Sequence, residues 1–251
     1  MIVRRHGGDL LLITQVDHAA LAGRIMSAWR ADRLPDRPTR TRVLDATARH
    51  DIGWLTVDAA PTVDVQSGAP HDFLNAPLAV RQGVWPRAID LLAADDRYVA
   101  ALVAHHARTV YSRYAGAPGW AAFFGDMDRR RDDLLALDGI ALDQLLDEYA
   151  FVGMGDLWSL MYCNAWPEPQ SRGKYAATLH LPAEPHAAAA GVVDGGQLEI
   201  TPDPFGGAAV PLEILARRVP ARRYESDADL RAEVARAPVV CLAAVAAARF
   251  E

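Results

Sequence analysis

The sequence predicts a mainly α fold, a bundle of helices with a small β-rich appendage formed by the C-terminal region and an N-terminal hairpin. Between residues 15 and 168, apolar residues recur at helical spacing in one segment after another. After residue 167, proline, glycine and short apolar runs replace these long periodic segments. We therefore expect an N-terminal β-hairpin (1–14), a helical domain (15–168) and a small β-rich region packed on the core (169–251).

The N-terminal segment has a clear hairpin pattern. The runs MIVRR and LLLIT flank the turn sequence HGGD, and such a turn between two apolar runs is typical of two antiparallel strands. This hairpin is expected to pair with the C-terminal sheet. A helix should follow from Asp17 to Trp29, where apolar residues such as Leu21 recur at helical spacing. His18 lies on the same apolar face as Leu21.

The remaining elements alternate with loops. Further helices are expected over 43–53, 78–93, 97–114, 120–137 and 142–163. Pro86 should kink or divide the helix in which it lies. Residues 58–77 are rich in proline, glycine and aspartate, and they predict a long surface connection of a kind that often carries function. The C-terminal region should contain strands over 175–181, 196–201, 210–219 and 239–245, and a helix over 227–236.

Four of the expected helices each place one ionisable residue on the apolar face. These residues are His18, His50, His106 and Asp156. Asp51, next to His50, would lie about 100° further round the same helix. One buried histidine is usually a core residue with a satisfied hydrogen bond, but a buried carboxylate is costly unless it is paired or binds a metal. Four such residues together predict a shared metal site.

Other histidines are weaker candidates. His105 lies at the edge of the apolar face that His106 shares, so it is expected to be a nearby helper or a surface residue. The 58–77 connection carries Asp58 and His71, which could line the mouth of a cleft. His180 and His186 lie in the β-rich region, far from the helical pattern, and are expected to be structural or exposed.

Composition narrows the class of protein. The chain is 51% hydrophobic and 23% charged, as in soluble globular proteins, and its net charge of -6 argues against nucleic acid as a partner. No apolar run is long enough for a signal peptide or a membrane span. Cys163 and Cys241 have neither metal-site nor disulfide spacing, which favours the cytoplasm. We expect the substrate to be a small molecule. The sequence is compatible with a homodimer.

The order His, His-Asp, Asp on successive helices resembles the HD-domain superfamily of metal-dependent enzymes, with His18, His50-Asp51 and Asp156 as the matching residues. The chain resembles more closely an uncharacterised bacterial family, a domain of unknown function with an HD-like helical core. This resemblance covers most of the chain and is carried by the segments QVDHAALAGRIMSAW, ARHDIGWLTVDAAP, HDFL, HHARTVY, DLWSLMYC and PDPF.

The superfamily resemblance implies a metal site. It assigns metal ligation to His18, His50, Asp51 and Asp156, and in two-metal members further histidines follow the His-Asp pair, for which His71 and His106 (or His105) stand in a suitable order. The metal would be a divalent transition ion, manganese, iron, zinc, nickel or cobalt, with magnesium as a further candidate. Whether one ion or two bind is left open.

The expected activity is that of an HD-type metal-dependent hydrolase, in which a metal-activated water attacks a small phosphate ester or anhydride. Asp51, Asp58 and His106 are the expected catalytic residues. Substrate contacts are expected from Trp54, Arg108 and Tyr111, and Arg113 or Lys174 are further candidates for its anionic end. The alternatives are an HD-like diiron oxygenase, with ligands His18, His50, Asp51, His71, His106 and Asp156, and a degenerate HD fold that only binds a ligand.

Overall fold

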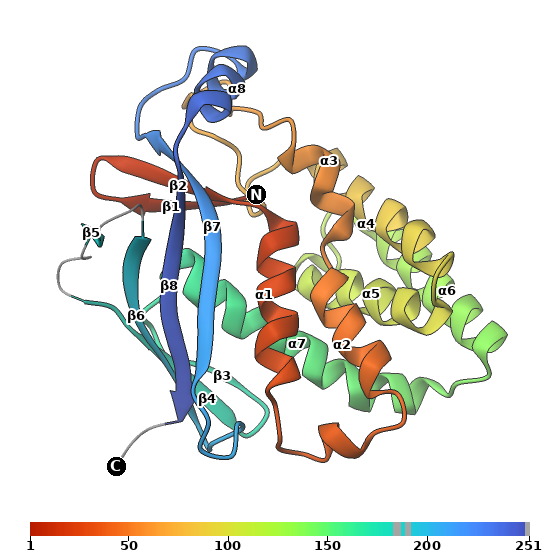
Figure 1. Ribbon diagram of the computed structural model, residues 1–251. Coiled ribbons are helices and arrows are strands. Elements are labelled where there is room, and N and C mark those ends of the chain that lie inside the picture. Colours follow the sequence, from red (N-terminus) through yellow and green to blue (C-terminus); the bar gives the residue numbers. More distant parts are fainter. Residues whose placement is uncertain (183–186, 189–191, 249–251) are drawn as a thin grey trace.

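The protein consists of two layers, a curled mixed β-sheet and a layer of helices on one side of it (Figure 1). The structure is a computed structural model and describes residues 1–182, 187–188 and 192–248. Helices α1 and α7 lie against the sheet, and α2, α4, α5 and α6 extend the helical layer away from it.

The sheet joins the two ends of the chain. Its strands are β1 (Ile2–His6), β2 (Asp9–Ile13), β3 (Gln170–Arg172), β4 (Tyr175–His180), β5 (Ala187–Ala188), β6 (Val192–Thr201), β7 (Val210–Pro220) and β8 (Val239–Ala248). They lie in the order β1-β2-β7-β8-β6-β4-β3, and β5 pairs with β6 off this path. Strands β6 and β8 are parallel, while all the other neighbouring strands are antiparallel.

The helical layer follows the apolar periodicity of the sequence. Its elements are α1 (Gln15–Ser27), α2 (Arg40–Arg49), α3 (Leu55–Asp58), α4 (Leu78–Ala93), α5 (Arg97–Val110), α6 (Ala121–Asp138) and α7 (Leu142–Asn164), with 3-10 turns η1 (Leu34–Asp36), η2 (Ile52–Trp54) and η3 (Ser112–Tyr114). Helix α8 (Asp227–Arg236) precedes β8. Helix α1 begins earlier than expected because the Thr14 side chain caps it by accepting a hydrogen bond from the Asp17 backbone N–H.

The predicted fold class is wrong. About half of the chain is helical, but the sheet is a curled structure that forms a full layer, not a small appendage on a mainly α bundle. Strand β7 is 11 residues long and alternates between buried and exposed residues, so every second side chain faces the helices. The hairpin does join this sheet, as expected, because β2 pairs with β7.

One local prediction also needs correction, and one of the two outcomes predicted at Pro86 does not occur. The helix that leads to His50 ends at Arg49, and a turn and η2 follow where a regular helix was expected to reach Gly53. Helix α4 is not divided at Pro86. The helix over 227–236 and the four C-terminal strands are confirmed.

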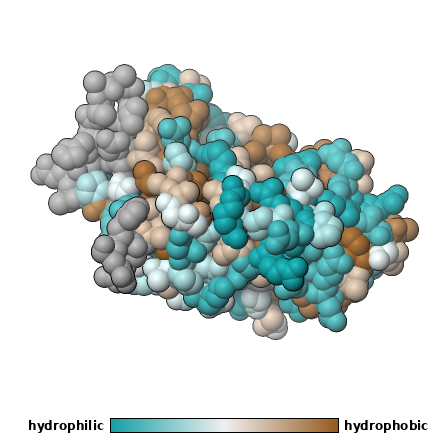
Figure 2. Space-filling view, turned by 60° about the horizontal axis from the view of Figure 1, so that its bottom comes forward, coloured by the Kyte–Doolittle hydropathy of each residue, from teal (hydrophilic) through white to brown (hydrophobic). Residues whose placement is uncertain are grey.

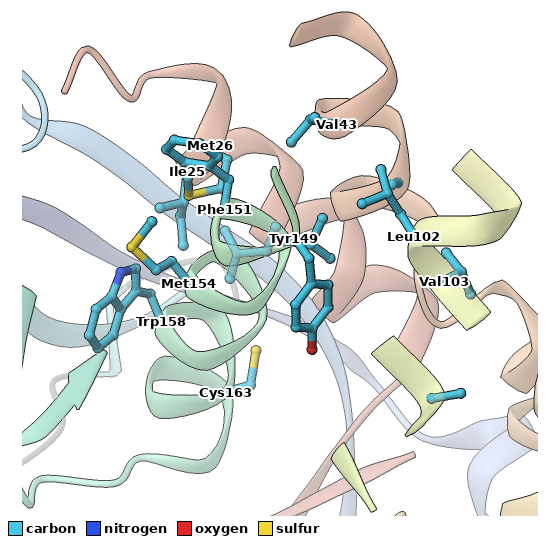
Figure 3. Packing of buried hydrophobic residues seen from close by; sticks show 14 of the residues in the cluster. Ile25, Met26, Val43, Leu102, Val103, Tyr149, Phe151, Met154, Trp158 and Cys163 are labelled. Carbon is cyan, nitrogen blue, oxygen red and sulfur yellow. The ribbon is translucent and has the colours of Figure 1, made fainter. Parts of the chain in front are cut away.

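The main hydrophobic core lies between the layers and contains residues from both. Figure 3 shows its part between α1 and α7, where Ile25 and Met26 lie near Phe151 and Trp158. Leu198 of β6 and Leu212 of β7 belong to the same cluster. The core is therefore continuous from the helices into the C-terminal strands.

The surface carries small apolar groups among polar ones. In the view of Figure 2, hydrophilic side chains cover most of the helical layer, and hydrophobic patches between them are scattered, as is normal for a protein surface. His180 is exposed and pairs with Glu199, whereas His186 lies outside the described residues. None of the described helices combines the length and the apolar character needed to cross a membrane.

Candidate metal centre

Five of the predicted residues meet inside the helical layer. His18 comes from α1, His50 and Asp51 from the turn that follows α2, His106 from α5 and Asp156 from α7. The three histidines are at most 1% exposed and Asp51 is 5% exposed, whereas the Asp156 side chain is 14% exposed, so solvent reaches the group mainly at Asp156. We call these five residues the His-Asp cluster.

The backbone after α2 explains how two adjacent residues can both point inward. Regular helix ends at Arg49, and Asp51 adopts φ -103° and ψ 18° before η2 begins. The turn packs closely on α4 because residue 53 is glycine: a Cβ there would lie 2.0 Å from the Val84 carbonyl oxygen. In an unbroken helix His50 and Asp51 would diverge by about 100°.

Ring nitrogens and carboxylate oxygens of the cluster face one another at short range. The Nε2 atoms of His18 and His50 are 3.3 Å apart. Asp156 Oδ1 lies 3.3 Å from His18 Nε2 and 3.5 Å from His50 Nε2. Asp51 Oδ2 lies 3.6 Å and 3.5 Å from the same two nitrogens. His106 Nε2 is more distant, 4.0 Å from Asp156 Oδ2.

Hydrogen bonds outside the cluster determine which ring nitrogens carry protons. His50 Nδ1 lies 2.8 Å from the Thr47 carbonyl oxygen, which can only accept, so Nδ1 donates. The Ser159 hydroxyl lies 3.0 Å from the Asp156 carbonyl oxygen and 2.8 Å from His18 Nδ1. When it donates its one proton to the carbonyl, it accepts from His18 Nδ1. In the neutral rings both Nε2 atoms are then lone-pair acceptors that face each other and two carboxylates. A cation, either a proton or a metal ion, is needed between them.

The pKa values reflect this crowding of acceptors. Burial works to lower the pKa of His50, but Asp51 and Asp156 outweigh it and raise that pKa to about 9. Burial lowers the pKa of His106 to about 3, so this ring is neutral at pH 7. Burial raises the pKa of Asp51. Burial also works to raise the pKa of Asp156, but hydrogen bonds from His18 and His50 hold it well below its usual range.

Two triads within the cluster have the spacing of metal ligands. One is His18, His50 and Asp51, and the other is His50, His106 and Asp156. Both use His50, whose Nδ1 is committed to Thr47 and whose Nε2 can bind only one ion. The two triads therefore cannot both hold an ion at the same time through His50.

Asp58 and His71 lie apart from the cluster. Asp58 accepts a hydrogen bond of 2.6 Å from the Gln15 backbone N–H, and its other oxygen lies 2.6 Å from the Met1 α-amino group. His71 contacts Thr62 Oγ1 at 3.0 Å. Asp58 and His71 line a separate cavity of about 200 Å³.

Three other side chains that the sequence suggested for the site, two cationic and one an imidazole, contact partners outside the His-Asp cluster. The Arg108 Nε atom pairs with Asp128 at 3.0 Å, and Lys174 pairs with Asp32. His105 lies 3.4 Å from an Arg131 nitrogen, and burial, followed by the charge of Arg131, lowers its pKa to about 4.

A cavity of about 220 Å³ opens from the cluster. Trp54, Tyr111 and Arg113, which the sequence suggested as substrate contacts, line this cavity. Sequence reasoning missed other members of the site, namely Gln15, Arg81, Trp85, Tyr149 and Ser159. Helical spacing could have indicated two of them, because Gln15 lies three residues before His18 and Ser159 three residues after Asp156.

The fold and the cluster together define a two-layer protein with helices on one side of a curled mixed sheet and a buried group of histidines and aspartates among the helices. The chain belongs to a family described as proteins of unknown function (DUF3891), whose family model matches residues 1–221. The expectation of an uncharacterised family is thereby confirmed, but the match shows no relationship to HD-domain proteins. Comparisons with curated proteins and with solved structures found no match.

Proposed function

We propose that the protein is a metal-dependent hydrolase of the HD type that acts on a small phosphate ester or anhydride. The observation that carries the proposal is the meeting of His18 Nε2 and His50 Nε2 with Asp51 and Asp156, while the two Nδ1 atoms contact Ser159 and Thr47 outside the cluster. Two imidazoles and two carboxylates suit a first-row divalent ion. An ion between them would make attractive contacts with all four side chains.

The remaining residues have roles around these ligands. When bound, a divalent ion lowers the pKa of a coordinated water and polarises a phosphoryl oxygen. Gln15 Nε2 donates to Asp51 Oδ2 at 3.1 Å and so fixes the orientation of that carboxylate. His106, neutral and lining the cavity, can accept a hydrogen bond from a water or a substrate hydroxyl near Asp156.

The geometry favours one ion over two. A diiron oxygenase would require His71 among its ligands, and His71 contacts Thr62 beside another cavity. His50 also offers a single free nitrogen to the two triads. We therefore propose a hydrolase with one ion, and the absence of both metal and turnover would instead favour a ligand-binding module.

The test is metal analysis of the full chain, purified without chelators and after reconstitution with manganese, iron, zinc, nickel, cobalt or magnesium. We expect about one equivalent per chain. Asp51→Asn keeps the shape of the side chain and removes its charge, so it should hold less than about a tenth of an equivalent. The matched control is Asp36→Asn, because Asp36 is exposed in η1 and should bind metal normally.

Activity is measured with p-nitrophenyl phosphate and bis(p-nitrophenyl) phosphate. Turnover should depend on the bound metal, disappear with a chelator and be lost in folded Asp51→Asn protein. A parent chain that takes up no metal, or Asp51→Asn and Asp36→Asn chains with equal metal content, would contradict the metal site. Metal without turnover on either ester would contradict the phosphohydrolase assignment.

A further inference from the structure

The cavity beside the His-Asp cluster has aromatic walls. The His106 ring lies 5.6 Å from Trp85, which lies 6.0 Å from Tyr111, and Tyr111 lies 6.2 Å from Tyr114. Trp54, Phe73 and Trp166 also line it. These aromatic rings form a series that begins at the His-Asp cluster and leads away from it. Such a surface is suited to a planar apolar molecule.

Several polar atoms of the wall have no hydrogen-bond partner within the described part of the chain. They are Gln15 Oε1, Trp54 Nε1 and Arg81 Nε. All three side chains line this cavity, and Gln15 and Trp54 are at most 3% exposed. Leaving buried donors unpaired is costly, and two of the three atoms are donors. The wall therefore favours a ligand that carries hydrogen-bond acceptors.

The far end of the ring series is positively charged. Arg81 and Arg113 both donate to the Tyr114 hydroxyl, at 3.2 Å and 3.0 Å, and both guanidinium groups lie over its ring. Neither arginine forms an ion pair with a carboxylate of the described residues, in contrast to Arg108, which pairs with Asp128. Both line the cavity. Two guanidinium groups without a carboxylate partner form a ready site for an oxyanion.

We propose that this cavity binds a small molecule with a flat aromatic body and one carboxylate or phosphate group. The anionic group is held by Arg81 and Arg113, and the body lies along Trp85 and Tyr111. The opposite end reaches the His-Asp cluster, and only this last assignment rests on the proposed function. The cavity of about 220 Å³ holds the volume of about seven water molecules, which limits the ligand to a compact one.

The test is isothermal titration calorimetry on the full chain, as purified and after removal of metal with a chelator. The probes are benzoate and phenyl phosphate, with benzyl alcohol as the neutral ring and inorganic phosphate as the anion without a ring. We expect benzoate or phenyl phosphate to bind at least ~10-fold more tightly than either control probe, because only they engage both rings and arginines. The preference should persist without metal, and it should weaken with added salt.

Single variants locate the binding site. Arg81→Gln and Arg113→Gln should each weaken binding of the anionic probe by about tenfold or more and leave benzyl alcohol within about twofold. Arg113 is exposed, so its variant keeps the test valid if Arg81→Gln fails to fold. Arg97→Gln, which removes an exposed arginine at the start of α5, should behave like the parent chain.

The proposal is overturned if no probe binds, if benzyl alcohol binds as well as the anions, or if Arg113→Gln behaves like Arg97→Gln. The same measurements distinguish a failure of this proposal from a failure of the proposed hydrolase. Benzoate binding by a chain that takes up no metal would support this site and reject the metal centre, whereas a metal-loaded chain that binds no probe would do the reverse.

Discussion

Ser159 acts on the cluster through a single proton. When its hydroxyl donates to the Asp156 backbone carbonyl, it accepts from His18 Nδ1, and His18 Nε2 is left directed at Asp156 and His50 without a proton. A residue outside the cluster thus selects the tautomer of one of its histidines. The Thr47 carbonyl has the same role for His50.

Replacement of Ser159 should weaken metal binding without removing a ligand. We expect Ser159→Ala to lower metal affinity by roughly 10- to 100-fold, the usual effect of losing a group that orients a ligating histidine. The measurement is competition with a chromophoric chelator. Ser171→Ala, an exposed serine on β3, is the control and should leave the affinity unchanged. Equal affinities for the two variants would show that His18 does not depend on Ser159.

The two cysteines should differ sharply in reactivity. Cys163 is 0% exposed, and burial raises its pKa to about 12, so its reactive thiolate is scarce until the pH approaches that value. Cys241 is partly exposed. At pH 8 we expect one thiol to react with a disulfide reagent in the native protein and two in denaturant. A native Cys241→Ser chain should react with none, and fast labelling of that chain would refute the burial of Cys163.

At the scale of elements, close packing between the η2 turn and α4 holds the cluster in shape. Gly53 lies against the Val84 carbonyl of α4, and a side chain there would force the turn away from that helix. His50 and Asp51 immediately precede this turn. The packing of residue 53 is therefore coupled to the positions of His50 and Asp51.

Two matched glycine substitutions test this packing. Gly53→Ala should lower the free energy of unfolding by about 1–3 kcal/mol, because the new Cβ would overlap the Val84 carbonyl. Gly125→Ala, in α6, has nothing within 4 Å of the new Cβ and should raise it by up to about 1 kcal/mol, since alanine favours helix. Urea denaturation measures both. A Gly53→Ala chain as stable as the parent would show that the turn can move freely.

The sequence predicted most helices to within a few residues, because their apolar stripes are local signals. Helix α8 was predicted with its observed bounds, and α4 and α5 begin where expected. The break after Arg49 could not be predicted in this way, because the turn that follows it packs on α4, which is distant in the sequence. His18, His50, His106 and Asp156 could be grouped because each interrupts an apolar stripe. Arg81 and Trp85 fit an ordinary amphipathic helix, so nothing local marked them as cavity residues.

At the scale of the whole molecule, the fold class was predicted wrongly because it also depends on contacts between distant segments. The existence of the C-terminal strands was visible in the sequence, but their pairing was not: Leu10 lies opposite Val219, and Ala177 opposite Ile200. Short apolar runs with many alanines suggested a minor sheet. The sheet is large because the N-terminal hairpin joins four long or medium strands of the C-terminal region in one layer. Such pairing between distant segments leaves no local signal in the sequence.

Removal of the C-terminal region tests how far the helices depend on the sheet. We expect a chain ending at Gln170 to lose cooperative thermal unfolding, because it would expose the faces of α1 and α7 that pack in the shared core. Circular dichroism on heating is the measurement, with the full chain as reference. A sharp transition in the shortened chain, together with retained metal binding, would show that residues 1–170 form an independent unit.

The pairing of β2 with β7 also has a consequence for how the chain reaches its native state. Leu12 of the hairpin lies opposite Arg217, about 200 positions later, so one edge of the hairpin has no native partner until most of the chain has been synthesised. Contacts of such large separation slow folding relative to a helical bundle, and an unpaired strand edge invites intermolecular association in the meantime. We therefore expect the yield of folded protein during expression to increase when translation is slowed by a lower temperature.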